Sequence, residues 1–284
     1  MVRALPPHPD LADCVAWYWS VDAAPGAPVD LRVDVYVDAR ADLVFNFGAP
    51  YRRTRLGEAA QELVASNFDA QRTTPIVIEQ RGAVSIAGVR FRAGGVAPFT
   101  DATLADVTDH VVPVDRVFGA EALELERALR AAAGDPEAQR RLFDAFFLGR
   151  RRRDRGRTTF ARLLAQLMEP ATDATVASAA AACGVSARHA TRLFRRHLGL
   201  PPRTMLQVTR FQRALDAMAA TPDGTVAAIA AACGYYDQAH LVRDVRRLAG
   251  GPPTTFRGYF PPEAPRAFAP NVVRFVQDGD APVP

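Results

Sequence analysis

The five-residue block AAACG occurs twice in this chain, at residues 180–184 and again at residues 230–234. In both copies a threonine precedes the block and an arginine-rich segment follows it. Self-similarity of this kind marks one supersecondary unit that is built more than once. Part of the chain must therefore fold as two related units, whatever the remainder does.

Each copy has the pattern of two helices joined by a sharp turn. In the first copy, Thr175 and Ser186 are residue types that cap helix N-termini, and Gly184 suits a turn that needs a positive φ. The equivalent residues of the second copy are Thr225, Asp237 and Gly234. Two helices around a short glycine turn, the second longer and basic, predict a helix-turn-helix unit in each copy.

The segment between the copies predicts one long helix that begins near Pro202. Its inner stripe consists of apolar residues at helical spacing, namely Val208, Phe211, Leu215 and Met218. Two recognition helices that enter one face of B-DNA lie about 34 Å apart, and a rigid linker helix would set that separation. We therefore expect residues 158–260 to form an all-α domain of two helix-turn-helix units joined by a linker helix.

The outward face of the second helix in each unit is suited to contact DNA. Arginine presents a fork to guanine, glutamine pairs with adenine, and small apolar side chains meet the thymine methyl. We predict base contacts by Arg188, Thr191, Arg192, Gln238, Ala239 and Arg243. Phosphate contacts suit the arginines later in each helix, which are Arg195, Arg196, Arg246 and Arg247. Asp244 either pairs with Arg243 and holds it in position, or weakens phosphate contact there.

Charge divides the chain into an acidic and a basic part. Residues 1–149 hold 15 Arg and 21 Asp or Glu, whereas residues 150–260 hold 18 Arg and 7 acidic residues, and the chain has no lysine. A basic part of this kind points to a polyanionic partner, and the repeat indicates double-stranded DNA. The run RRRRDRGR at residues 150–157 predicts a basic linker that is either solvated or in contact with phosphates.

Residues 1–149 predict an α+β domain. Stretches such as LRVDVYVDA and DLVFNFG alternate apolar and polar residues, which is typical of antiparallel strands. From Gly119 onward the period becomes helical, and Gly134 and Pro136 separate two helices. We expect a curved antiparallel sheet with these helices beside it, and a mostly irregular, proline-rich tail at residues 261–284. The complete chain is thus predicted to be multidomain.

With these residues in view, residues 158–258 resemble the DNA-binding domain of the AraC/XylS family of bacterial transcription regulators. GVSARHATRLFRRHLGLPP is similar to the family's first unit, and GYYDQAHLVRDVRRLAGGPPTTFRGYF to its second. The family's base-reading positions fall on the six residues predicted above. The resemblance implies a sequence-specific transcription regulator, with RNA polymerase as a further partner.

The N-terminal half is similar to an uncharacterised amino-terminal domain found in one subgroup of these regulators, on stretches such as LADCVAWYWSVD. In better-known members of the family this half binds a small-molecule effector, forms a homodimer, or does both. Asn46, Arg90 and Arg92 are the polar residues predicted to orient an effector. The neighbouring aromatic residues either enclose an apolar ligand or simply fill the core, and in the latter case dimerisation through residues 119–150 is the remaining role.

An enzyme is not expected, because the chain shows no nucleophile motif and its five histidines lack metal-ligand spacing. No cofactor or metal is predicted. Two alternatives stay open: a catalytic N-terminal domain fused to a DNA-binding module, which would require a reactive Cys14, and a sequence-blind architectural protein. No apolar run approaches the length of a membrane span and no signal peptide is evident, so a cytoplasmic protein is expected.

Overall fold

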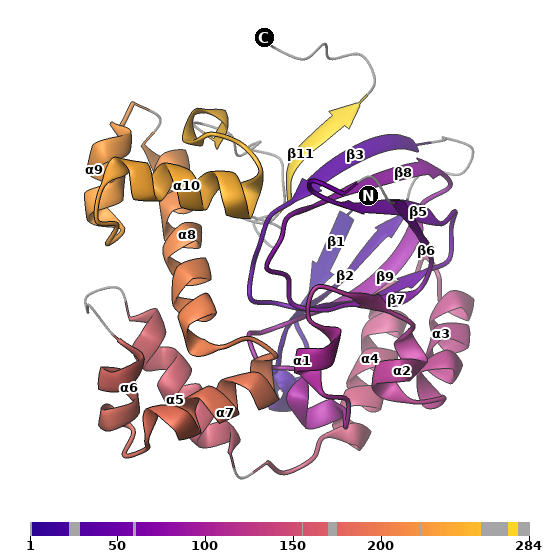
Figure 1. Ribbon diagram of the computed structural model, residues 1–284. Coiled ribbons are helices and arrows are strands. Elements are labelled where there is room, and N and C mark those ends of the chain that lie inside the picture. Colours follow the sequence, from indigo (N-terminus) through magenta and orange to yellow (C-terminus); the bar gives the residue numbers. More distant parts are fainter. Residues whose placement is uncertain are drawn as a thin grey trace.

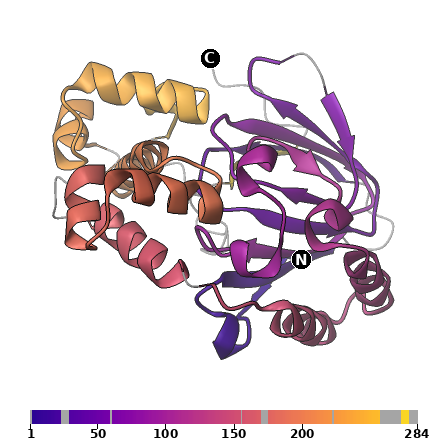
Figure 2. The same ribbon diagram turned by 60° about the horizontal axis from the view of Figure 1, so that its bottom comes forward.

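The chain forms a sheet-rich N-terminal part and a helical C-terminal part that lie side by side (Figures 1 and 2). The computed structural model describes residues 2–22, 29–58, 61–154, 156–169, 175–221, 223–256 and 272–277. The predicted α+β domain followed by an all-α domain of two helix-turn-helix units is confirmed.

Eleven strands make two antiparallel sheets in the described part of the chain. In spatial order, the six-stranded sheet contains β1 (Val2–Leu5), β2 (Val15–Asp22), β9 (Ser85–Phe91), β4 (Asp42–Asn46), β7 (Asn67–Asp69) and β10 (Val111–Val112). The five-stranded sheet contains β11 (Val272–Gln277), β3 (Val29–Val35), β8 (Ile76–Gly82), β5 (Tyr51–Arg55) and β6 (Gln61–Val64). The alternation in the sequence predicted strands, but not their division between two sheets.

The apolar core of this part lies on one face of the six-stranded sheet. Strand alternation places Phe45 of β4 and Phe91 of β9 on that face, where both are fully buried. They pack against helices that follow the sheet in sequence, and the rings of Phe91 and Phe147 lie 5.5 Å apart. The covering helices are α1 (Leu104–Val107), α2 (Val114–Phe118), α3 (Glu121–Ala131) and α4 (Pro136–Arg150).

The opposite face of the same sheet carries buried charges instead. Arg90 donates to both carboxylate oxygens of Asp42, at 2.9 and 2.6 Å. Arg53, on the five-stranded sheet, donates to Asp69 of the six-stranded sheet at 3.0 Å. Buried charges persist only when they are paired in good geometry. Arg90 and Asp42 join neighbouring strands of one sheet, whereas the Arg53–Asp69 pair ties the two sheets together.

The helical part contains the predicted duplication. Helix α5 (Arg157–Met168) precedes the first unit, and the remaining helices are α6 (Val176–Ala182), α7 (Ala187–Leu198), α8 (Pro202–Ala220), α9 (Val226–Ala232) and α10 (Gln238–Ala249). The side chains of Ser186 and Asp237 cap the recognition helices α7 and α10, as expected. Gly184 and Gly234 have φ values of 70° and 73°, which confirms both glycine turns.

Strand β3 ends at Val35, although the alternation of the sequence continues to Asp38. Residues 36–39, here called the interdomain loop, leave the sheet and enter the core of the helical part. Val37 is fully buried there, and the ring of Tyr36 contacts that of Phe256 at 5.2 Å. The apolar side chains that continue the alternation beyond Val35 therefore pack against the helical part and do not extend the strand.

The expected irregular tail contributes one strand within the described residues. Residues 272–277 pair with β3 as β11 and extend the five-stranded sheet. The rest of the tail, residues 261–271 and 278–284, lies outside the described residues, as does Arg155 of the basic linker.

A second contact between the two parts is formed at the end of α7. Gly199 terminates this helix with φ of 78°, and the Thr108 hydroxyl donates to its carbonyl at 3.3 Å. A Cβ atom at Gly199 would lie 2.6 Å from the Leu104 carbonyl oxygen of α1. The N-terminal part thus contacts both helix-turn-helix units.

We expect Gly199→Ala to destabilise the protein more than Gly134→Ala does. Both glycines have positive φ, which costs an L-residue about 1–2 kcal/mol, but only a Cβ at Gly199 also meets a backbone atom. Urea denaturation of the two variants measures the difference. Equal losses of unfolding free energy in the two variants would contradict close packing of α1 against Gly199.

Candidate nucleic-acid interface

Helix α7 separates its residues into an inner and an outer face as predicted. Ala190 and Phe194 are buried in the helical core, because the α6–α7 turn packs the apolar side of the helix inward. Arg188 and Arg192 are exposed, and Thr191 is half-buried with its hydroxyl donating to the Ala187 carbonyl at 2.9 Å. The three predicted base-reading residues of this unit therefore share one accessible face.

Helix α10 repeats the arrangement. Gln238, Ala239 and Arg243 are exposed, whereas Leu241 and Val245 are fully buried. The two recognition helices lie toward opposite ends of α8 (Figure 1). Helix α8 has 19 residues and is therefore about 28 Å long at 1.5 Å per residue, a length comparable with the ~34 Å between successive major grooves on one face of DNA.

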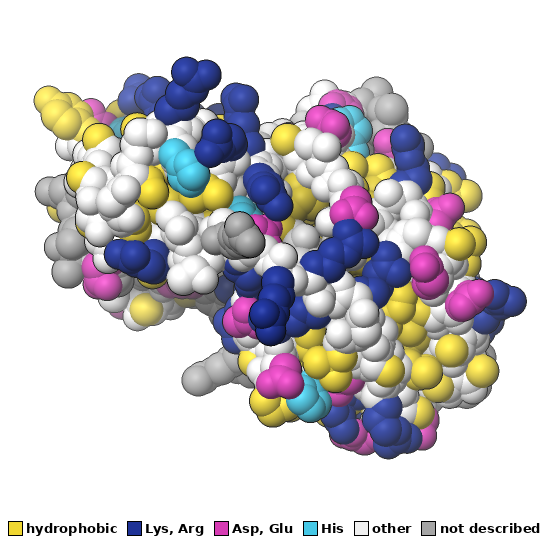
Figure 3. Space-filling model, turned by 90° about the horizontal axis from the view of Figure 1, so that it is seen from below, with side chains coloured by type: hydrophobic (Ala, Val, Ile, Leu, Met, Phe, Trp, Pro, Cys, Tyr) yellow, Lys and Arg dark blue, Asp and Glu magenta, His cyan; other side chains and the backbone are white. Residues whose placement is uncertain are grey.

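The arginines of this surface differ in how they are held. Arg196 pairs with Asp154 of the linker at 3.4 Å. Arg192 Nη2 lies 2.8 Å from His189 Nδ1, one turn earlier in its helix. Among the arginines of α7 and α10, those that pair with no carboxylate of the described residues are Arg188, Arg192, Arg195, Arg243 and Arg246. Arginine side chains gather on the helical side of the molecule and near its junction with the sheets (Figure 3).

The Asp244 carboxylate lies against the linker helix and not beside Arg243. It points inward, accepting a hydrogen bond from Gln207 at 2.9 Å and lying 3.5 Å from Arg210, both on α8. Its ion pairs are with Arg210 and Arg247 rather than with Arg243, so the structure does not support the expectation that it holds Arg243, and weaker phosphate contact stays a prediction. The sequence signal for this cluster was an acidic residue at a position where the first unit has the buried Leu193.

His197 is fully buried at the C-terminal end of α7. Its ring stacks on Phe160 at 4.9 Å, and its Nε2 lies 3.7 Å from Asp154. Burial lowers the pKa of His197 below its ordinary value of 6.5, which outweighs the opposite effect of Asp154. The neutral imidazole is therefore part of the packing of the first unit.

The stability of the protein should fall below about pH 6.5 because of His197. The unfolded chain takes up a proton near that pH, whereas the folded chain does so only at lower pH, so acid favours unfolding. We expect His197→Leu, which copies Leu248 of the second unit, to reduce the loss of melting temperature between about pH 7.5 and 5.5. The exposed His110→Gln variant is the control, and an equal loss in all three proteins would contradict this reading.

The three residues predicted to orient an effector do not meet at one site. The Asn46 amide donates to the Ala49 carbonyl at 2.9 Å, Arg90 pairs with Asp42, and Arg92 donates to the Ala12 carbonyl at 2.6 Å. Each is thus engaged in a structural contact. Of the three, Arg90 alone belongs to the buried charge network described above. Its Nη1 lies 3.6 Å from Asp38 Oδ2.

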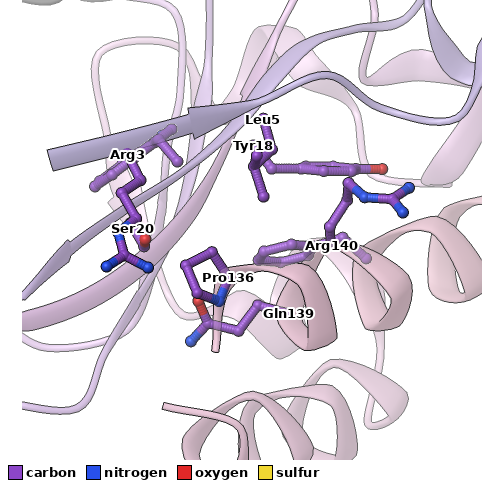
Figure 4. A pocket seen from close by; sticks show the side chains of 9 residues that line it. Arg3, Leu5, Tyr18, Ser20, Pro136, Gln139 and Arg140 are labelled. Atoms are coloured by element: carbon purple, nitrogen blue, oxygen red, sulfur yellow. The ribbon is translucent and has the colours of Figure 1, made fainter. Parts of the chain in front are cut away.

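A shallow hollow lies between β1, β2 and α4. Arg3 and Arg140 stand on its two sides, with Ser20 and Gln139 between them (Figure 4). This hollow encloses only about 10 Å³, whereas pockets for small organic ligands usually enclose about 300–1,000 Å³, and none of the predicted effector residues lines it. It does not correspond to the effector site expected from the sequence.

Cys14 does not have the character of a reactive thiol. It is fully buried, and burial raises the pKa of its thiol to about 11, whereas catalytic cysteines need a lowered pKa. The described residues contain no cluster of three metal-ligating side chains. No helix among them is long and apolar enough to cross a membrane.

Two family models match the chain, on the two parts seen in the fold. Residues 179–259 match the model described as a helix-turn-helix domain, and residues 3–113 match a domain of unknown function, DUF6597. The fold and the exposed recognition helices thus define a helix-turn-helix DNA-binding protein. The chain thus carries an AraC-type helix-turn-helix domain in its C-terminal part and a DUF6597 domain in its N-terminal part.

Several solved structures are similar to this chain. ToxT from Vibrio cholerae is 8% identical with a TM-score of 0.42, over 84% of this chain and 96% of that one. An AraC-type regulator from Chromobacterium violaceum is 22% identical with a TM-score of 0.33, over 41% and 97%. A probable AraC family regulator from Rhodopseudomonas palustris is 27% identical with a TM-score of 0.30, over 35% and 91%. No curated protein matches the chain.

Proposed function

We propose that this regulator reads two adjacent major-groove segments of its DNA site, one with α7 and one with α10. The observation that carries the proposal is the placement of two exposed, capped recognition helices toward opposite ends of one continuous helix, α8. Exposed arginines on both helices supply the fork that guanine requires. Double-stranded DNA is therefore the partner of the helical part.

Two uncharged residues at the start of α10, Gln238 and Ala239, favour sequence-specific reading over sequence-blind binding. Gln238 and Ala239 are exposed at the start of α10, where glutamine and a small apolar side chain suit adenine and the thymine methyl. A protein that recognised only the phosphate backbone would gain more from arginine at both places. The catalytic alternative loses its one candidate nucleophile, because the Cys14 thiol is buried with a raised pKa.

Selection from random DNA duplexes with the full chain, followed by footprinting, tests the two-groove proposal. We expect a site of about 15–20 bp with two protected patches whose centres lie about 10 bp apart. One continuous patch of less than half that length would contradict reading by two helices.

The predicted division between base and phosphate contacts gives different mutant phenotypes. Arg192→Ala or Arg243→Ala should cost about 1–3 kcal/mol of binding free energy on the selected site and relax preference at one base pair. Arg195→Ala or Arg246→Ala should weaken binding to all sequences alike and reduce the salt slope by about 1. Fluorescence anisotropy over a range of salt concentrations measures both effects. If Arg192→Ala weakened selected and random DNA equally, its assignment to a base would be wrong.

We further propose that the N-terminal domain controls DNA reading through the interdomain loop. The Val37 amide donates to the Leu248 carbonyl of α10 at 3.1 Å, and its carbonyl accepts from Gln212 of α8 at 2.6 Å. The next residue, Asp38, reaches the charge network between the sheets through Arg90. A change inside the N-terminal domain therefore has a short path to both helices, through the Asp38 ion pair and the two hydrogen bonds of Val37.

Two causes would produce such a change. One is a small-molecule effector that competes for Arg90, the predicted effector residue that contacts the loop. The other is a homodimer formed through α3 and α4. In either case RNA polymerase is the partner through which the bound regulator would alter transcription, in the cytoplasm where both partners meet.

Gln212→Ala tests the control through the loop. Loss of its hydrogen bond to Val37 leaves α8 and α10 freer to move, so we expect binding to the selected DNA to weaken by about 0.5–1.5 kcal/mol. Thr204→Ala, about 12 Å away along the same helix, is the control and should bind like the wild type. Unchanged affinity of Gln212→Ala would argue against control through this loop.

A further inference from the structure

One polar cluster is present in the second helix-turn-helix unit and absent from the first. The two recognition helices correspond residue by residue from their caps, so Asp244 of α10 takes the place of Leu193 of α7. Both side chains are buried, with 6% of Leu193 and 5% of Asp244 exposed. The duplicated unit thus carries a carboxylate at a position where an apolar residue suffices for folding.

The Asp244 carboxylate is held mainly by the linker helix. Its Oδ1 accepts from Gln207 Nε2 at 2.9 Å, and its Oδ2 lies 3.5 Å from Arg210 Nη2. From its own helix, Arg247 and His240 approach it at 3.6 and 3.9 Å. One hydrogen bond and one ion pair from α8 therefore hold the buried side of α10.

Arg210 joins the same cluster to the turn of the second unit. Its guanidinium lies 4.6 Å from the centre of the Tyr235 ring, which directly follows Gly234. The ring of Tyr235 in turn meets His240 edge-on at 5.1 Å. Linker helix, turn and recognition helix therefore share one set of polar contacts.

Stability alone does not account for this arrangement. A buried ion pair pays a desolvation cost that often equals its attraction, and apolar residues of similar volume usually stabilise at least as well. Directional polar contacts differ from apolar ones in selecting one relative orientation, the best-attested role of buried polar groups. In this protein the orientation concerned is that of a DNA-reading helix.

We propose that Asp244 is a positioning residue that, through Gln207 and Arg210, fixes the angle of α10 on α8. It thereby sets the spacing between the two DNA boxes that the protein accepts. The inference rests on the proposed reading of two groove segments. In the first unit, Leu193 takes the equivalent place and packs in the apolar core.

The direction in which Asp244→Asn changes DNA affinity distinguishes a positioning role from simple charge repulsion. Asp244→Asn and the exposed Asp223→Asn each raise the net charge by one. If Asp244 acted only through its charge, both variants would bind any DNA somewhat more tightly. A positioning role instead makes Asp244→Asn weaker on the specific site.

The probes are the duplex selected by the wild-type chain, the same duplex with one base pair inserted between its boxes, and a random duplex. We expect Asp244→Asn to bind the selected duplex about tenfold more weakly than the wild type, while Asp223→Asn binds it at least as well. The one-base-pair insertion should cost the wild type about tenfold or more and Asp244→Asn less than about threefold. Affinity and spacing penalty equal to those of Asp223→Asn would overturn the proposal.

A double variant decides the question if Asp244→Asn folds poorly. Asp244→Leu combined with Arg210→Met leaves the net charge unchanged and gives the second unit the residue of the first, so its melting temperature should stay close to that of the wild type. We expect a reduced spacing penalty in this variant, and an unchanged penalty at an unchanged melting temperature would overturn the proposal. A wild-type chain that selects no preferred sequence would instead contradict the proposed function itself.

Discussion

The helical part depends on the burial of one apolar stripe along α8. Val208, Phe211, Leu215 and Met218 are all buried on this stripe, in the same core as Phe194 of the first unit and Val245 of the second. Each unit on its own has only two short helices to shield its apolar side chains. Because both units bury them against one helix, their recognition helices are held in one frame.

Charged groups, by contrast, set orientation in this protein where apolar packing would leave it free. The Arg90 and Asp42 pair and its neighbours lie between the two sheets, and the Asp244 cluster lies between α8 and α10. Both clusters are buried, where misplaced charges are costly. The interdomain loop lies between them, since Val37 contacts α8 and α10 while Asp38 reaches Arg90. Hydrogen bonds and an ion pair of this loop therefore connect the N-terminal domain to the second unit.

The sequence predicted more of the DNA-contacting surface than of the N-terminal domain. Helix caps and helical spacing are local signals, so the exposed faces of α7 and α10 followed from residues within one or two turns. Strand alternation showed that Arg90 faces away from Phe91, but it could not show that Asp42 lies opposite. It also continued through residues 36–39, where the chain leaves the sheet, because apolar side chains at alternate positions suit an interface as well as a strand.

The sequence by itself determined the duplicated unit, its caps and glycine turns, the linker helix and the basic face, because each depends on residues close together in the chain. Only the tertiary structure decided which charges meet. Arg90 and Asp42 are 48 positions apart, and Gln212 and Val37 are 175 apart. The partner of a buried polar group is set by which elements pack together, and packing is the collective result of the whole apolar core rather than of any local pattern.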